Sequence, residues 1–130
     1  MWAIIKFDKK NLEFLKNNIK KKLGNEVEFY LPKIFVEKYK NNKLVGQELN
    51  LLGDYLFFSH DKLKNKSILN ELKFTKGLKY FLDGFANSQN EIKKFIKKCK
   101  NFENKDGSIS SNFFELKINE KYRFNSGPLL

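Results

Sequence analysis

The chain has one cysteine, one histidine and one arginine among its 130 residues, and each scarcity excludes a class of site. Cys99 alone cannot form an intrachain disulfide, so we expect a reducing, cytoplasmic compartment. A single histidine and a single cysteine are too few for a closed tetrahedral zinc site. Because Arg123 carries the only guanidinium, bidentate recognition of phosphate or of a base edge is nearly excluded, and lysine contacts remain.

Patterns typical of catalysis are also scarce. His60 stands between Ser59 and Asp61, the residue types of a hydrolytic triad, but neighbours in sequence cannot flank one imidazole as a working triad does. The acidic residues are scattered among lysines. Gly77 and Gly84 are isolated turn glycines and do not form a phosphate-binding loop. We therefore expect no enzymatic activity, no metal and no cofactor.

Long apolar runs are missing as well, whereas positive charge and aromatic residues are abundant. The run after Met1 ends at Lys6, which is too short for a signal peptide or a membrane span. An aromatic share of 15% predicts one packed globular domain and argues against a disordered lysine tail. The net charge of +11 favours phosphate-rich polymers, although the lysine and asparagine codons of an AT-rich genome would produce the same composition.

Hydrophobic periodicity predicts the element order β-α-β-hairpin-β-α-β-α-β. The apolar opening segment favours a central strand buried on both faces. A capping box at 88–91 starts the last helix, and Cys99 falls on its apolar face as a small buried hydrophobe. The expected segments are strands at 2–7, 27–31, 55–58, 78–82, 113–118 and 122–124, helices at 9–23, 67–72 and from 88, a hairpin at 34–52 and an exposed loop at 101–112. This order suits an α+β fold in which helices pack on one antiparallel sheet, with a ferredoxin-like arrangement as the simplest candidate.

The strand at 55–58 is apolar on both faces. Period-two alternation puts Tyr55 and Phe57 on one face, and Leu56 and Phe58 on the other. A sheet that helices cover on one side needs only one apolar face. The second face is therefore either core or a contact for a partner.

Several blocks of the sequence resemble those of NusG amino-terminal domains. The segment LLGDYLFF at 51–58 resembles the family's PLFPGYVFV motif, and TKGLKYFL at 75–82 is similar to its T-R/P-G-V-x-x-F-V block. WAIIKF at 2–7 resembles the WYxxx start, and YLP at 30–32 resembles the xxP that follows helix one. EKYRFNSGPL at 120–129 resembles the beginning of a KOW domain. The resemblance implies a NusG amino-terminal-like domain at 1–119, followed at 120–130 by an interdomain tail or the start of a truncated KOW domain.

This resemblance implies an α+β, ferredoxin-like NGN architecture with a long β-hairpin. It also implies a monomeric transcription elongation and antitermination factor that binds the clamp helices of the largest RNA polymerase subunit and suppresses pausing, with no membrane contact. Carried over by position, the polymerase-binding residues would be Leu52, Tyr55, Phe57, Ile92 and Phe95.

The resemblance further implies mainly backbone contacts to DNA of the transcription bubble. The residues that would face this DNA are Lys9, Lys10, Thr75 and Lys76, for which ordinary solvated surface is the alternative interpretation.

The sequence departs from the family at several positions. Gly53-Asp54 replaces the usual Pro-Gly, Lys6 replaces an aromatic residue of RfaH-like members, and 68–70 lacks their His-Thr-Thr. A stand-alone RNA- or single-stranded-DNA-binding ferredoxin-like module, with aromatic residues stacking on bases, is therefore the alternative function. The characteristic RRM strand motif is absent, which argues against that alternative.

Overall fold

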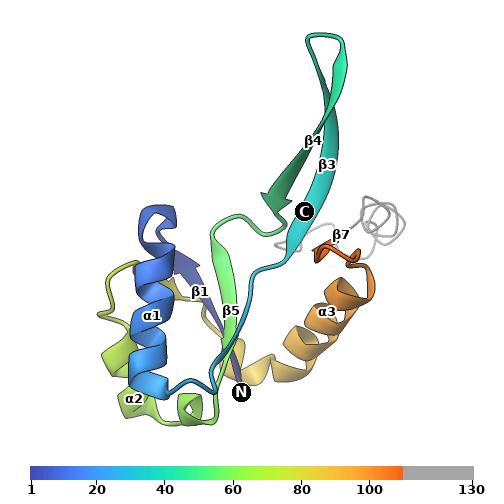
Figure 1. The fold of residues 1–130 in the computed structure, drawn as a ribbon. Coiled ribbons are helices and arrows are strands. Elements are labelled where there is room, and N and C mark those ends of the chain that lie inside the picture. The colour runs from blue at the N-terminus through green and yellow to red at the C-terminus, as the bar shows by residue number, and fades with distance from the viewer. Residues whose placement is uncertain (110–130) are drawn as a thin grey trace. The chain divides into compact units, whose positions relative to one another are not determined.

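The computed structural model describes residues 1–109, which form two compact units (Figure 1). Among these residues, the first unit consists of Met1–Leu31 and Asp54–Lys94, and the second of Pro32–Gly53 and residues 95–109. The chain has the expected α+β fold, with helices packed on an antiparallel sheet.

The first unit contains a four-stranded sheet in the order β2-β5-β1-β6, and each pairing is antiparallel. This is the strand order of a ferredoxin-like β-α-β-β-α-β fold, and the hairpin is inserted between its second and third strands. The elements are β1 (Trp2–Phe7), η1 (Lys9–Asn11), α1 (Leu12–Leu23), β2 (Glu28–Tyr30), β5 (Tyr55–Ser59), η2 (Asp61–Lys64), α2 (Lys66–Leu72), β6 (Leu78–Phe81), η3 (Phe85–Asn87) and the start of α3 (Gln89–Asn101), which continues into the second unit.

The core of the first unit lies between the sheet and the pair α1 and α2. Leu15, Ile19 and Leu23 recur at every fourth position of α1, and all three are buried against the sheet. From the sheet, Ile5 and Phe58 meet them with no exposed surface. Complete burial of such a side chain contributes about 1.5–3 kcal/mol.

Strand β1 is central, as expected, but it is not buried on both faces. Its burial alternates, so that Ala3, Ile5 and Phe7 are fully buried while Ile4 and Lys6 stay partly exposed. The expectation of two buried faces was wrong because α1 and α2 cover only the face that carries the first three residues.

Side-chain hydrogen bonds and a glycine mark the ends of the helices. The side chain of Asp8 accepts a hydrogen bond from the Lys10 N–H at 3.2 Å, and the first expected helical turn is a 3-10 turn. Gly24, with a φ of 107°, ends α1. At α3 the Gln89 side chain bonds both backbone groups of Trp2, with N···O distances of 2.7 Å, which joins the helix start to β1.

The second unit is built on the expected hairpin, formed by β3 (Lys33–Lys40) and β4 (Lys43–Asn50). The two strands pair antiparallel without a bulge from the Lys33 and Asn50 pair to the Lys40 and Lys43 pair. Asn41 and Asn42 close the turn with φ values of 54° and 63°. Two successive left-handed residues are typical of a type I′ turn, whose twist matches that of the strands.

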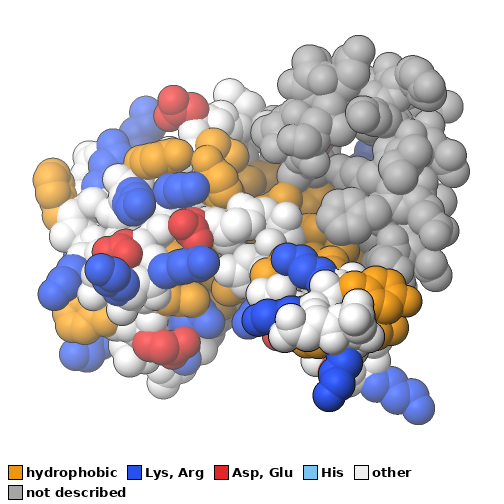
Figure 2. All heavy atoms as spheres, turned by 90° about the horizontal axis from the view of Figure 1, so that it is seen from above, with side chains coloured by type: hydrophobic (Ala, Val, Ile, Leu, Met, Phe, Trp, Pro, Cys, Tyr) orange, Lys and Arg blue, Asp and Glu red, His pale blue; other side chains and the backbone are white. Residues whose placement is uncertain are grey.

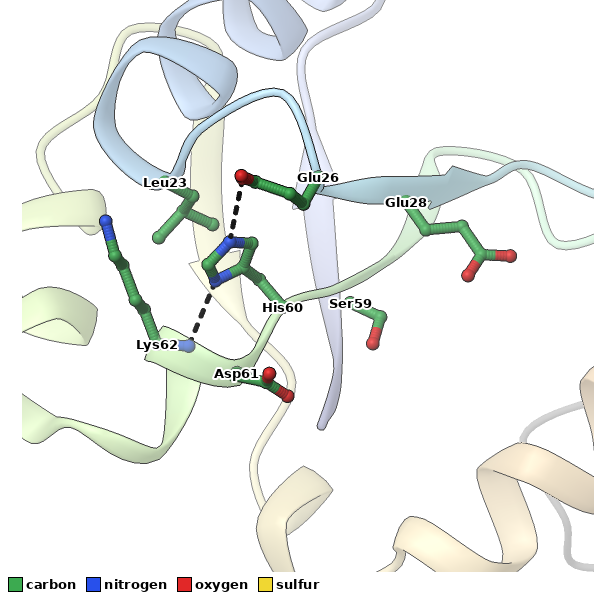
Figure 3. A pocket seen from close by; sticks show the side chains of 7 residues that line it. All are labelled: Leu23, Glu26, Glu28, Ser59, His60, Asp61 and Lys62. Carbon is green, nitrogen blue, oxygen red and sulfur yellow. Dashed lines mark hydrogen bonds and ion pairs between the residues drawn. The ribbon is translucent and has the colours of Figure 1, made fainter.

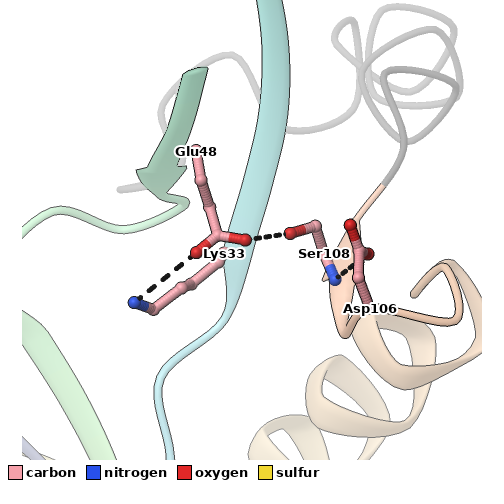
Figure 4. A network of polar contacts seen from close by, with 4 residues as sticks. All are labelled: Lys33, Glu48, Asp106 and Ser108. Atoms are coloured by element: carbon pink, nitrogen blue, oxygen red, sulfur yellow. Dashed lines mark hydrogen bonds and ion pairs between the residues drawn. The ribbon is translucent and has the colours of Figure 1, made fainter. Parts of the chain in front are cut away.

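Strand β7 (Ser108–Ile109) pairs parallel with the start of β3, and both of its residues are buried. The expectation of an exposed loop at 101–112 was therefore wrong for these two residues. The Ser108 hydroxyl donates to the Glu48 carboxylate, which also lies 3.7 Å from the Lys33 ammonium (Figure 4). The strands expected at 113–118 and 122–124, and the segment 120–130, lie outside the described residues.

Replacing Phe58 with alanine should lower the free energy of unfolding by about 3–5 kcal/mol, because its ring is fully buried in the core of the first unit. Denaturant unfolding monitored by circular dichroism measures this change. Phe74→Ala is the matched control: its ring is 89% exposed, and its removal should change the free energy by less than about 0.5 kcal/mol. Similar losses in both variants would contradict the assigned core.

Candidate functional site

The four-stranded sheet has a second face, opposite α1 and α2, which carries Ile4, Lys6, Tyr55, Phe57 and Tyr80; we call it the outer face. Register places Lys6 of β1 directly between Tyr55 of β5 and Tyr80 of β6. The three side chains therefore form a row across the sheet, in which one cation lies between two phenols.

The members of this row contact one another. The hydroxyls of Tyr55 and Tyr80 lie 3.1 Å apart, within hydrogen-bond distance, and the Lys6 ammonium lies 4.7 Å from the centroid of the Tyr55 ring. An ammonium at that distance from an aromatic ring is attracted by the ring's quadrupole. Tyr80 is 47% exposed, so the row is accessible from solvent.

The hydrogen bond with Tyr55 raises the pKa of Tyr80 above its usual 10.0, and desolvation adds to the increase. Both causes favour the neutral phenol, because an ionised Tyr80 could no longer donate a hydrogen bond to Tyr55 and would lose part of its hydration.

The five expected polymerase-binding residues differ in exposure and belong to both units. Tyr55 is partly exposed on the outer face, whereas Phe57 and Ile92 are buried, with exposed fractions of 3% and 5%. The ring of Phe57 packs at a tilt against that of Tyr30, with centroids 6.4 Å apart. Leu52 and Phe95 belong to the second unit and are partly exposed there.

Of the residues on the outer face, the sequence did not point to Tyr80 or to a role for Lys6. Alternation within β6 could have placed Tyr80 opposite the buried face of that strand. Its proximity to Tyr55, however, depends on the strand order, which no local pattern contains.

The expected DNA-facing segments do come together. The Asp8 N–H donates to the Gly77 carbonyl at 2.8 Å, which joins the start of η1 to the turn that carries Lys76. Gly77 has a φ of 95°, and a Cβ there would lie 3.0 Å from the Cβ of Asn11. A glycine is therefore required for this close approach.

Three lysines of this region are exposed, namely Lys9, Lys10 and Lys76. The Lys76 ammonium lies 5.7 Å from the centroid of Phe14, whose ring is 52% exposed. Figure 2 shows lysine side chains spread over the visible face with fewer acidic side chains between them. This region can offer point charges to a phosphate backbone, which is the contact that lysines make.

Thr75, the fourth expected DNA-facing residue, is buried, with only 7% of its surface exposed. Its N–H donates to the Leu72 carbonyl, and its carbonyl accepts from the Leu78 N–H. The hydroxyl of Thr75 has no hydrogen-bond partner among the described residues. The side chain of Thr75 is therefore buried and does not lie on the surface that carries the three lysines.

His60 lies in a shallow hollow of about 460 Å³, lined by residues of the first unit (Figure 3). The Nδ1 atom of His60 accepts a hydrogen bond from the Lys62 N–H at 3.0 Å, which caps η2. Its Nε2 lies 3.6 Å from the Glu26 carboxylate. A backbone hydrogen bond, and then the contact with His60, lower the pKa of Glu26 below its usual value. In this arrangement the imidazole serves as a helix cap.

Within residues 1–109, no group of three or more His, Cys, Asp and Glu side chains is placed to hold a metal ion. In the same part of the chain, no helix is both long enough and apolar enough to cross a membrane.

Substituting Tyr55 with phenylalanine should lower the pKa of Tyr80 towards its usual value, because the hydroxyl partner is lost. A raised pKa stabilises the folded chain at pH values below the ordinary 10.0, and this contribution disappears as the pH rises through the raised pKa. A spectrophotometric titration of tyrosinate measures the shift. Tyr39→Phe, at a ring that is 80% exposed, is the control and should leave the pKa of Tyr80 unchanged.

Thr75→Val should keep or raise the free energy of unfolding, by up to about 1 kcal/mol. The change replaces a buried hydroxyl that has no partner within residues 1–109 by a methyl group of similar size. Thermal and denaturant unfolding measure this change. A clear loss of stability would mean that the hydroxyl has a partner, such as an ordered water. A loss of DNA binding without a loss of stability would instead place Thr75 in the nucleic-acid contact.

The chain matches no protein-family model, and no curated protein is significantly similar to it. Similarity to a relative therefore assigns neither a family nor an activity. The functional interpretation depends on the fold, on the outer face of the sheet and on the lysine-bearing turn beside η1.

Proposed function

We propose that this chain is a NusG-like amino-terminal domain, a non-enzymatic module of transcription elongation and antitermination that binds the clamp helices of the largest RNA polymerase subunit. One observation carries the proposal. Three blocks that resemble the family, far apart in sequence, form three adjacent strands of one sheet: β5 from 51–58, β1 from 2–7 and β6 from 75–82.

The hairpin insertion supports the same proposal. The resemblance implies a ferredoxin-like domain with a long β-hairpin, and the hairpin of this chain is inserted between β2 and β5, two strands that pair with each other. A ferredoxin-like order is common and does not by itself indicate a function. Its combination with this insertion and with the ordered blocks favours the NusG-like interpretation.

In the first unit, the proposed polymerase contact centres on Tyr55, with Lys6 and Tyr80 beside it. An aromatic ring that is partly exposed and held by neighbours is typical of an interface anchor, because little side-chain entropy is lost on binding. Phe57 shares this face with Tyr55 but is buried, as is Ile92, so neither would be an exposed anchor of the contact.

The proposed DNA contact involves Lys9, Lys10 and Lys76. These lysines would hold the backbone of the transcription bubble by charge alone, so the contact would weaken as the salt concentration rises. A module that binds both the clamp and the DNA favours the closed clamp, because it binds that state better than the open one. Suppression of pausing follows from this population shift. We infer a monomer that acts in the cytoplasm.

A stand-alone RNA- or single-stranded-DNA-binding module is the second candidate. The row of Tyr55, Lys6 and Tyr80 favours it, because single-strand binding combines aromatic platforms with positive charge. The two candidates differ in their partner, so measuring the Tyr55-dependent binding of the polymerase and of a single strand distinguishes them.

Tyr55→Ala should weaken binding to bacterial core RNA polymerase by about thirtyfold, which corresponds to the roughly 2 kcal/mol or more lost on truncating an interface anchor. Binding is measured by pull-down and by titration with the purified polymerase at moderate salt. Tyr39→Ala is the matched control, since it removes an equally large but more exposed ring from the hairpin, and it should bind as the unchanged chain does.

Equal binding by Tyr55→Ala and the unchanged chain would reject the proposed contact. If the unchanged chain binds no polymerase, including that of its source organism, but binds a single-stranded oligonucleotide in a Tyr55-dependent manner, the second candidate replaces the first. A circular dichroism spectrum of each variant excludes misfolding as the cause.

A further inference from the structure

The outer part of the β3–β4 hairpin has no core of its own. Strand β7 pairs with β3 only at Lys33 and Ile34, so beyond these residues the described hairpin has two strands. All residues from 37 to 49 are exposed. A two-stranded hairpin of this kind contributes little to the stability of a domain. Its length is better explained by a surface that it presents than by packing.

The register of the hairpin gathers three lysines on one face. Lys38 and Lys40 lie on the same face of β3, and Lys43 of β4 lies directly opposite Lys40. Like charges directly opposite each other destabilise a sheet. None of the three lysines forms an ion pair with another residue between 1 and 109. An anion that bridges them would remove this repulsion.

The acidic residues of the hairpin do not neutralise this lysine face. Glu37 and Glu48 both lie on the opposite face of the ribbon. Glu48 is already engaged by Lys33 and by the Ser108 hydroxyl at the base of the hairpin (Figure 4). The face that carries Lys38, Lys40 and Lys43 therefore has no carboxylate from the hairpin itself.

Aromatic side chains also lie on the face opposite the lysines. Tyr39 pairs across the strands with Leu44 beside the turn, and the Phe35 ring lies over Gly46, where a Cβ would collide with it. Such cross-strand pairs stabilise a ribbon. The lysine face itself carries no aromatic residue, so it has no platform on which an unpaired base could stack.

We propose that the face formed by Lys38, Lys40 and Lys43 binds the phosphate backbone of duplex DNA. Single strands are bound through aromatic residues interleaved with positive charge, and this face has the charge alone. In a duplex the bases already stack on one another, so backbone contacts suffice. A two-stranded ribbon also fits the major groove, which is about 12 Å wide. This contact requires no polymerase, so it can be tested independently of the proposed function.

The test is a titration of the complete chain with a fluorescently labelled duplex of roughly 20 base pairs at several salt concentrations, followed by anisotropy. The triple variant Lys38→Gln, Lys40→Gln and Lys43→Gln should bind at least about tenfold more weakly at roughly 0.1 M salt. The slope of the logarithm of affinity against the logarithm of salt should decrease in magnitude by about 2–3, one unit for each lost phosphate contact.

The matched control removes the same charge elsewhere, by Lys64→Gln, Lys66→Gln and Lys73→Gln at exposed positions around α2. Its affinity should stay within about threefold of that of the unchanged chain, and its salt slope within about one unit. An equal loss in both triple variants would overturn the proposal in favour of general attraction by net charge.

Unchanged affinity in the hairpin variant, with its circular dichroism spectrum and melting temperature preserved, would also overturn the proposal. The same holds if a single strand of equal length binds more tightly than the duplex and Tyr39→Ala abolishes that binding. That result would assign the hairpin to base stacking.

Discussion

The packing of α1 against one face of the four-stranded sheet is the interaction on which the rest of the first unit depends. Leu15, Ile19 and Leu23 close over a layer of strand residues that have no exposed surface. Strands alternate their side chains, so this packing also decides which residues form the outer face. The row of Tyr55, Lys6 and Tyr80 is thus a consequence of the core. Shifting one of these strands by a single residue would turn its member of the row towards the core.

Much of this arrangement could be predicted from local patterns. Spacing by four along α1, alternation in β5 and the Asn41-Asn42 turn are signals that short segments carry by themselves, and the structure confirms all three elements. Strand β7 was missed because its burial comes from pairing with β3, far away in the chain, and from the acceptor that Glu48 offers to Ser108. Polar composition cannot reveal such a partner.

Surface residues were harder to predict than elements. The row on the outer face needs three strands in the correct order, and the exposure of Lys76 beside the burial of Thr75 arises from the close approach of the turn to η1. The hydrophobic periodicity of the sequence cannot tell that Lys76 is exposed and that Thr75 is buried. The hollow at His60 shows the same limit, because an imidazole that looks available in sequence is engaged by a backbone N–H.

The place of the hairpin in the chain has a consequence for how such a protein can diversify. The hairpin closes its own loop: the Leu51 N–H donates to the Pro32 carbonyl at 2.8 Å, and the strands between pair along their whole length. The flanking strands β2 and β5 pair with each other independently. A self-closed insertion between paired strands adds little loop-closure entropy when it lengthens or shortens. Evolution can therefore exchange the hairpin as a module, and an engineer can place a probe at its turn, without redesigning the sheet.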